Sequence, residues 1–342
     1  MDPKAIANEP VPARQGVPGP PAELIALYRD MVRLRTYDDR SVVYHRQGRI
    51  GTYAIFWGHE ALQAGAIHAL GADDWIFPSY RESAVGLLRG MPASTVLSWW
   101  RGHPDGWWNP REWRIGSIAV PVGSHVPHAA GMAWGLKLRG ERTCVLAIFG
   151  DGATSTGAFH EGMTFASAKR VPAVFLCNNN SWAISTPTAE QSGAERLVDK
   201  AAGYGMEGSR VDGADALTVR DAVAEAAARA RAGEGPQFIE AVTFRGAPHA
   251  TADDPGRYMD PAQLGAARER ECLGRFENRL RQLGVLDERA IGEIRDEAQA
   301  EMEAGIEAAE ALPDPDPRQV FDTTYALPPR ALRRDRDSAL ES

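Results

Sequence analysis

The sequence predicts an α/β fold in which a parallel sheet is flanked by helices. Short apolar, β-rich stretches support this prediction, and longer stretches with helical spacing separate them. Strands that alternate with helices are joined by crossover connections, and such connections build a parallel sheet. The chain has 342 residues, which is enough for one large or two modest domains with a sizeable core.

The expected strands are runs of apolar residues that end in glycine or in polar residues. Residues 143–149 form a continuous apolar run, which is typical of a strand buried on both faces. Residues 171–177 form a second such strand, with Pro172 at its start, where a missing N–H group is tolerated. A third strand is expected over 238–244, where β-favouring residues alternate, and a short one around 209–211.

Helices are expected before, between and after these strands. Apolar residues recur at helical spacing over 23–46, and a second helix is predicted over 60–70. The stretch 157–169 reads as a crossover helix, and the alanine-rich stretch 218–232 as another. Residues 264–312 are polar and helical, with a charged face that we expect to be exposed.

Composition divides the chain into three regions and narrows the class of protein. Residues 1–20 contain five prolines and are expected to form a disordered arm, 21–312 the folded domain, and 313–342 an extended C-terminal tail. A net charge of -8 argues against a nucleic-acid or anionic-membrane partner, and no apolar run has the length of a membrane span. Three widely spaced cysteines, two of them in apolar runs, fit a reducing compartment and hence a cytoplasmic protein.

Ligand-type residues follow two predicted strands at the point where each strand ends. Gly150-Asp151-Gly152-Ala153 follows the first strand and Asn178-Asn179-Asn180 the second, and both ends should lie on one rim of the sheet. The side-chain oxygens of Asp151 and Asn180 suit magnesium, and a backbone carbonyl such as that of Trp182 could serve as a third ligand. The glycines and the N–H groups at the start of a helix suit a phosphate. The pattern therefore indicates a magnesium–diphosphate site.

Two further stretches carry groups that suit the same ligand. Tyr80 and Arg81 place a phenol beside a guanidinium, which can bind phosphate through two hydrogen bonds. His249 follows the third strand and can donate or accept a proton near neutral pH. Each residue also has a structural interpretation: a helix cap for Asp151, an ion pair for Arg81, a surface histidine for His249 and a turn for 178–180.

In order and spacing these residues resemble the alpha subunit of the thiamine-diphosphate-dependent, decarboxylating component of 2-oxo acid dehydrogenase complexes. Gly150-Asp151-Gly152 followed by Asn179-Asn180 matches the thiamine diphosphate fingerprint of that family. The other stretches that match, in family order, are 47–53, 80–82, 182–186, 248–255 and 320–325. The resemblance implies that 21–312 form a thiamine diphosphate-binding α/β domain with helical N- and C-terminal extensions.

The resemblance implies a role for each matching position. Asp151, Asn180 and the Trp182 carbonyl would bind the magnesium ion, and His249 would be the catalytic residue that assists the intermediate and the transfer to a lipoyl group. The residues implied to contact the cofactor are Tyr80, Arg81, Val120, Val122, Gly150, Asp151, Gly152, Ala153, Asn180, Trp182 and His249. Of these, the two valines would meet the aminopyrimidine through their backbone.

The resemblance also implies partners and a reaction. In this family the glutamate that acts on the aminopyrimidine belongs to a separate beta subunit, so we expect an α2β2 heterotetramer that acylates a lipoyl-bearing acyltransferase component. The expected reaction is oxidative decarboxylation of a 2-oxo acid, with pyruvate favoured by Gly51-Thr52-Tyr53-Ala54 and by 77–80. A branched-chain 2-oxo acid and acetoin are the alternatives.

Some positions depart from the family pattern, and two other classes of protein would carry different features. His59 and His125 stand where glutamine is frequent, and Ala250 stands where mammalian relatives carry a regulatory serine, so phosphorylation is not expected at that position. A non-catalytic paralogue would be favoured by loss of the proposed ligands, which are present. An unrelated nucleotide-binding module would be favoured by a P-loop or a GxGxxG motif, and neither occurs at Gly150.

Overall fold

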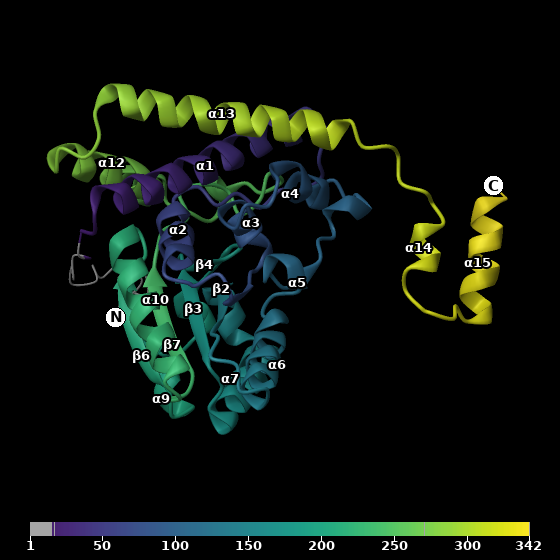
Figure 1. Ribbon diagram of the computed structural model, residues 1–342, viewed down its shortest axis with the longest axis horizontal. Helices are drawn as coiled ribbons and strands as arrows, with labels where there is room; N and C mark the ends of the chain where they lie inside the picture. Colours follow the sequence, from purple (N-terminus) through teal and green to yellow (C-terminus); the bar gives the residue numbers. More distant parts are fainter. Residues whose placement is uncertain (1–15, 17, 270, 342) are drawn as a thin grey trace.

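A parallel sheet forms the centre of the protein (Figure 1), as the sequence predicts. The computed structural model describes residue 16 and residues 18–269 and 271–341. The five strands pair in the order β1-β2-β3-β7-β6, and every pair is parallel. The strands are β1 (Trp75–Phe77), β2 (Val145–Gly150), β3 (Ala173–Asn179), β6 (Glu207–Asp212) and β7 (Gln237–Val242).

Helices cover both faces of this sheet. α6 and α7 pack on one face, α2 and α10 pack on the other, and α1 and α13 form a further layer outside α2 (Figure 1). The longer helices are α1 (Pro21–Arg46), α2 (Glu60–His68), α4 (Ala93–Trp100), α6 (His125–Leu138), α7 (Gly157–Lys169), α10 (Ala216–Arg231), α11 (Pro261–Glu269), α12 (Cys272–Gln282) and α13 (Glu288–Glu310). The shorter ones are α3 (Val85–Leu88), α5 (Pro110–Trp113), α8 (Thr188–Gln191) and α9 (Lys200–Gly203).

Strands β1, β2 and β3 are mostly apolar because each of them supplies two hydrophobic cores, whereas the edge strand β6 is polar and largely exposed. Leu146 and Ile148 of β2 enter the core formed with α1, α2 and α10. The alternate residues Ala147 and Phe149 enter the core formed with α6 and α7. Successive side chains of a strand point to opposite faces, so a strand covered on both faces reads as one continuous apolar run.

Most predicted elements are confirmed, with shifted ends. The predicted helix over 157–169 coincides with α7, where the Thr156 side chain caps the first turn. β3 begins and ends two residues later than predicted, so Asn178 and Asn179 belong to the strand rather than to the turn after it. Several elements had no sequence prediction, among them β1, which has only three residues, and α6, which carries a proline in its first turn.

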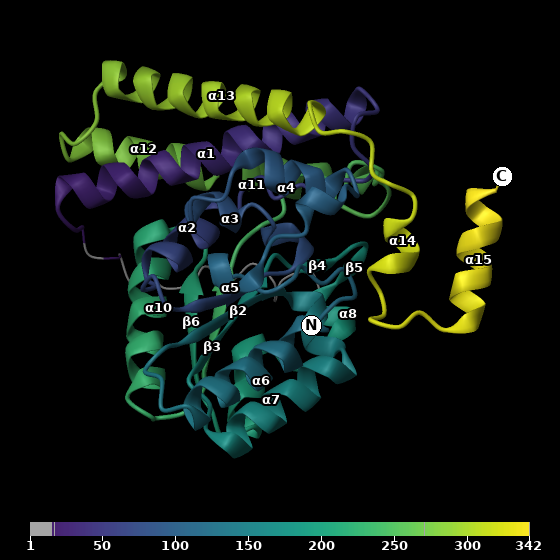
Figure 2. The same ribbon diagram turned by 45° about the vertical axis from the view of Figure 1, so that its right-hand side comes forward.

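The two terminal regions, 1–20 and 313–342, were predicted to lie outside the folded domain. Most of the predicted N-terminal arm, 1–20, lies outside the described residues. The prediction of an extended tail over 313–342 is wrong in its secondary structure, because α14 (Gln319–Asp322) and α15 (Arg330–Leu340) are helical. Both helices lie to one side of the main body (Figures 1 and 2). No helix within the described part of the chain combines the length and apolar character needed to cross a membrane.

Two glycines in the paired helices α6 and α7 should respond in opposite ways to the same substitution. A Cβ added at Gly131 of α6 meets nothing within 4 Å, so Gly131→Ala should stabilise the protein by about 0.5–1 kcal/mol through helix propensity. A Cβ at Gly162 of α7 would lie 2.9 Å from Val126 Cγ1 and 3.0 Å from the Pro127 nitrogen. Gly162→Ala should therefore destabilise it by about 1–3 kcal/mol through overpacking. Urea unfolding of both variants measures this, and two changes of the same sign would contradict it.

Candidate active site

The strand ends bring the predicted ligand residues to one rim of the sheet. Gly150 at the end of β2 lies opposite Asn178 in β3, and Asn179 lies opposite Val242 at the end of β7. The chain leaves β2 directly into a short 3-10 helix, Asp151–Ser155. Parallel strands in this register release their loops on the same side of the sheet, which is where open α/β sheets bind ligands.

Asp151 is a buried carboxylate that only neutral groups stabilise directly. Its Oδ2 accepts hydrogen bonds from Thr188 Oγ1 at 3.1 Å and from Gln191 Nε2 at 3.2 Å, both on α8. Burial raises the pKa of the Asp151 carboxyl above its ordinary value, and these hydrogen bonds act against that rise. Among the described residues, no lysine, arginine or histidine lies within ion-pair distance of it. A cation at this point would supply the charge that is missing.

Asn180 and Trp182 lie in a tight turn that packs against the Asp151 helix. Asn180 is buried, and its Oδ1 accepts a hydrogen bond from the Trp182 N–H at 3.1 Å. The turn continues into a two-stranded hairpin, β4 (Trp182–Ala183) and β5 (Thr186–Pro187). A Cβ added at Gly152 would lie 2.8 Å from the Cβ of Ala183, so only glycine allows this close approach. The packing places three oxygen-bearing groups on one side of the rim.

These oxygens suit magnesium by chemical type. A carboxylate, an amide carbonyl and a backbone carbonyl are hard ligands, and magnesium commonly takes few protein ligands and completes its octahedron with phosphates and water. No group of three histidine, cysteine, aspartate or glutamate side chains in the described part of the chain is placed to hold a metal. The predicted set does not form such a group, because Asp151 is its one carboxylate.

A cluster of two arginines and a histidine lies beside the same hairpin, where Arg245 Nη2 donates to the Ile184 carbonyl at 2.7 Å. Arg81 Nη2 donates to His249 Nδ1 at 2.9 Å and to the His249 carbonyl at 3.1 Å. Arg245 Nη1 donates to the same His249 Nδ1 at 3.3 Å, and its Nη2 donates to Tyr258 Oη at 2.8 Å. Both arginine side chains are buried. Neither forms an ion pair among the described residues, and the nearby carboxylate of Asp253 accepts from the His249 N–H and the Tyr258 hydroxyl instead. The two guanidinium charges exceed that single negative charge, so the cluster suits an anion.

Burial and two neighbouring guanidiniums keep His249 neutral. Burial is the largest cause, and together with the charges of Arg81 and Arg245 it lowers the pKa of the His249 imidazole to about 4. The imidazole is therefore neutral at pH 7. Since arginine only donates hydrogen bonds, Nδ1 of His249 acts as the acceptor, and the neutral ring carries its proton on Nε2.

The remaining predicted residues lie beside this cluster. The Tyr80 ring lies edge-on to the His249 ring, with centroids 6.3 Å apart. Val120 and Val122 are 59% and 49% exposed, in a loop whose Ala119 pairs with Ser79, just before Tyr80. That exposure leaves the loop open to a ligand or a partner chain. Ala153 lies near Gly123 of the same loop, within 3.6 Å of where a Cβ of residue 123 would stand.

Several site residues had no functional prediction from the sequence. Arg245 follows directly after the predicted third strand, 238–244, and a charged residue at the end of a buried strand was a usable signal. Asn178 Nδ2 donates to Glu82 Oε1 at 3.2 Å and approaches His59 Nδ1 at 3.2 Å, which joins β3 to the loop after β1 and to α2. These contacts depend on tertiary packing, and no local sequence pattern marks them.

Known proteins resemble the chain over most of its length. The sequence profile described as "Dehydrogenase E1 component" matches residues 28–318. The "3-methyl-2-oxobutanoate dehydrogenase subunit alpha" of Mycobacterium tuberculosis is 40% identical over 311 residues, which cover 91% of this chain and 85% of that protein. The "Pyruvate dehydrogenase E1 component subunit alpha" of Staphylococcus epidermidis is 38% identical, over 91% of this chain and 84% of its own length. The protein of that name in Staphylococcus aureus is 39% identical over 84% and 78%.

The charge of Arg81 should hold the pKa of His249 down. Arg81→Gln removes one of the two neighbouring positive charges and should raise the His249 pKa from about 4 toward its ordinary 6.5. Because the native pKa is depressed, neutral His249 contributes stability that is complete above pH 6.5 and declines as the pH falls toward 4. Histidine NMR titration measures the shift, with the distant Arg170→Gln as control. An unchanged His249 pKa in Arg81→Gln would contradict the assignment.

Proposed function

The chain belongs to the dehydrogenase E1 component family, and on that premise we propose that it is the alpha subunit of a 2-oxo acid dehydrogenase. With a beta subunit it catalyses the thiamine-diphosphate-dependent oxidative decarboxylation of a 2-oxo acid. The acyl group then passes to a lipoyl group on an acyltransferase component. The reaction belongs to the oxidoreductases that act on an oxo group with a disulfide as acceptor.

One observation supports this proposal most strongly: buried charges of both signs follow the strand ends without forming direct ion pairs among the described residues. Asp151 is a buried carboxylate with no cation at ion-pair distance, and Arg81 and Arg245 are buried cations with no carboxylate at ion-pair distance. A magnesium ion held by a diphosphate carries both of the missing charges. The ion would be bound by Asp151, Asn180 and the Trp182 carbonyl, and the arginines would face the phosphate oxygens.

The residues of this chain would serve the reaction mainly by binding and by holding a proton. Thiamine diphosphate, when bound, supplies a carbon nucleophile and an electron sink for the decarboxylation. His249 carries its proton on Nε2, so it can donate a hydrogen bond to an oxygen of the reacting group. Arg81 and Arg245 keep the ring in this tautomer, because both donate to Nδ1. Tyr80 lies against the ring and limits its movement.

The proposal includes a beta subunit as a necessary partner. The residues on this rim suit the magnesium and diphosphate end of the cofactor, and the aminopyrimidine end requires a group that starts carbanion formation. That group is expected from the beta subunit in an α2β2 heterotetramer, placed against the exposed loop of Val120 and Val122. A cytoplasmic location would fit such an assembly and its three buried, unpaired cysteines. A non-catalytic, cofactor-binding paralogue is the alternative.

Removing the proposed metal ligand should abolish magnesium-dependent cofactor binding. Asp151→Ala deletes the one carboxylate of the proposed ligand set, so titration of the assembled α2β2 protein with thiamine diphosphate and magnesium should give no calorimetric signal. The control is Asp105→Ala, which makes the same change at a side chain that is 61% exposed and distant from the rim. Binding of unchanged affinity in Asp151→Ala would show that Asp151 is no ligand.

Substrate preference is a separate prediction. We propose pyruvate as the substrate, with a branched-chain 2-oxo acid second and acetoin third; both pyruvate and branched-chain enzymes are among the relatives. The assembled α2β2 protein should give its highest kcat/KM for decarboxylation with pyruvate, compared with 3-methyl-2-oxobutanoate. Acetoin is tested by its thiamine-diphosphate-dependent cleavage. A higher kcat/KM for 3-methyl-2-oxobutanoate than for pyruvate would overturn the first choice. Absence of activity with all three would favour the non-catalytic paralogue.

A further inference from the structure

The residues 53–57 form a buried segment without regular secondary structure between α1 and the cationic cluster. Tyr53, Ala54, Ile55 and Phe56 are all less than 9% exposed. An irregular buried segment must find partners for its backbone groups on other elements, since it has no ladder or helix of its own. Its shape therefore depends on the groups that surround it.

On one side, this segment holds two parts of the cationic cluster. The backbone of Tyr53 pairs with Thr251, two residues beyond His249: the Thr251 N–H donates to the Tyr53 carbonyl at 2.9 Å, and the Tyr53 N–H donates to Thr251 Oγ1 at 3.1 Å. The carbonyl of Ile55 accepts a hydrogen bond from Arg81 Nη1. A shift of the segment would thus move Arg81 and the His249 loop together.

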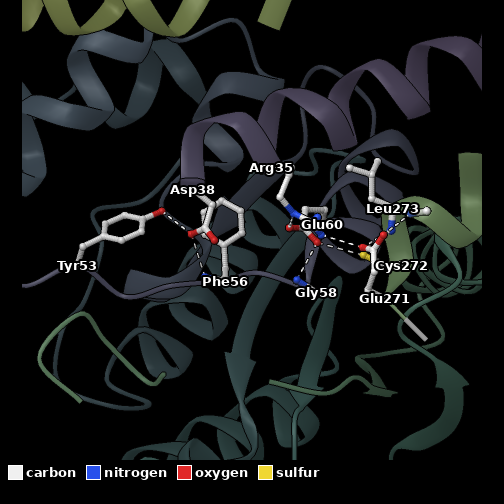
Figure 3. Close-up of polar contacts among 10 residues, drawn as sticks. Arg35, Asp38, Tyr53, Phe56, Gly58, Glu60, Glu271, Cys272 and Leu273 are labelled. Carbon is white, nitrogen blue, oxygen red and sulfur yellow. Dashed lines mark hydrogen bonds and ion pairs between the residues drawn. The ribbon is translucent and has the colours of Figure 1, made fainter. Parts of the chain in front are cut away.

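On the other side, a single carboxylate of α1 accepts hydrogen bonds from two residues of the segment. Asp38 Oδ1 accepts hydrogen bonds from the Tyr53 hydroxyl at 2.8 Å and from the Phe56 N–H at 3.0 Å (Figure 3). Asp38 is 1% exposed, and burial raises its pKa to about 7. The buried Oδ2 of the same carboxyl has no hydrogen-bond partner among the described residues. A carboxyl kept in such an environment is costly, which argues that its position matters.

Helix α1 also contacts the end of the segment, at Trp57, through a second charged side chain. The guanidinium of Arg35, one turn before Asp38 on α1, lies 4.8 Å from the Trp57 ring centroid. Trp57 packs against Gly246, where an added Cβ would lie 2.3 Å from the indole ring. Arg35 also forms an ion pair with Glu60 at 2.6 Å, and Glu60 accepts from the Gly58 N–H (Figure 3). Helix α1 thus supports both ends of the segment, beside the loop that carries Arg245.

We propose that Asp38 is a positioning residue, which sets the place of Arg81 and of the His249 loop through the segment 53–57. It touches neither of them directly and acts through its hydrogen bonds to Tyr53 and Phe56. The inference concerns the shape of the site proposed above and rests on that function only for its consequence in catalysis. Its structural part is testable in the chain itself.

Hydrogen–deuterium exchange of the full-length chain tests the proposal without requiring catalysis. Asp38→Ala removes both hydrogen bonds and should speed exchange in the peptide covering 249–254 by about tenfold or more, because the Thr251 N–H loses a fixed acceptor. Asp38→Asn keeps an acceptor oxygen, resembles the protonated carboxyl and should restore protection to within about threefold of wild type. Asp39→Ala makes the same deletion at the adjacent exposed aspartate and should change nothing in this peptide.

A second set of variants separates positioning from general destabilisation. Leu136→Ala in α6 removes a side chain from the core on the face of the sheet opposite α1, and it should lower the melting temperature without faster exchange over 249–254. Tyr53→Phe removes only the hydroxyl bond and gives a smaller effect of the same kind if Asp38→Ala fails to fold. Unchanged exchange in both Asp38→Ala and Tyr53→Phe, or equal acceleration in Leu136→Ala, would overturn the proposal.

Activity of the assembled α2β2 protein gives the consequence for catalysis. If the proposed function holds, Asp38→Ala should lower kcat more than it raises KM, and Asp38→Asn should recover most of the loss. Wild-type protein without decarboxylase activity, combined with the expected exchange pattern, would refute the proposed function and leave the positioning role standing. Decarboxylase activity of the wild type, combined with unchanged exchange in Asp38→Ala and Tyr53→Phe, would refute the positioning role and leave the proposed function standing.

Discussion

The parallel register of β1, β2, β3 and β7 is the constraint on which the rest of the structure depends. Because Gly150 lies opposite Asn178, and Asn179 opposite Val242, the chain leaves successive strands at one level. Asp151, the Asn180 turn and the His249 loop all follow within a few residues of those ends. A register shift of one residue in β2 would move Leu146 and Ile148 to the opposite face of the sheet and separate the site residues. Apolar packing on both faces disfavours such a shift and so preserves the site geometry.

The rim combines this rigid support with buried charges that form no direct ion pairs among the described residues. A buried carboxylate faces one part of the rim, and two buried guanidiniums share one imidazole at another. Such an arrangement opposes folding in the absence of a ligand, as is common where a site is shaped for a bound ion rather than for stability. The binding of magnesium and diphosphate would therefore stabilise the fold as well as prepare it for chemistry.

The sequence was informative wherever one local pattern had one physical cause. Helix α7 could be predicted to the residue because its apolar spacing and its Thr156 cap are local, and Asp151 and Asn180 could be placed because strand ends in a parallel sheet share a rim. Two sets of contacts could not be predicted in this way. Arg245 donates to His249 within an irregular loop, and Asp38 accepts hydrogen bonds from Tyr53 and Phe56, which lie in another irregular segment. Strand β1 was missed because three residues carry no usable periodicity. Helical propensity in the arginine-rich tail was outweighed, in the prediction, by its charge and its prolines.

As proposed, this chain supplies half of an active site. Its rim suits the diphosphate end of the cofactor, and the loop of Val120 and Val122 is open toward a partner. The most direct test is the decarboxylation of a 2-oxo acid by the purified chain with thiamine diphosphate and magnesium, alone and after assembly with its beta subunit. The account predicts no turnover by the chain alone and full turnover by the α2β2 protein. Full turnover by the chain alone would contradict it.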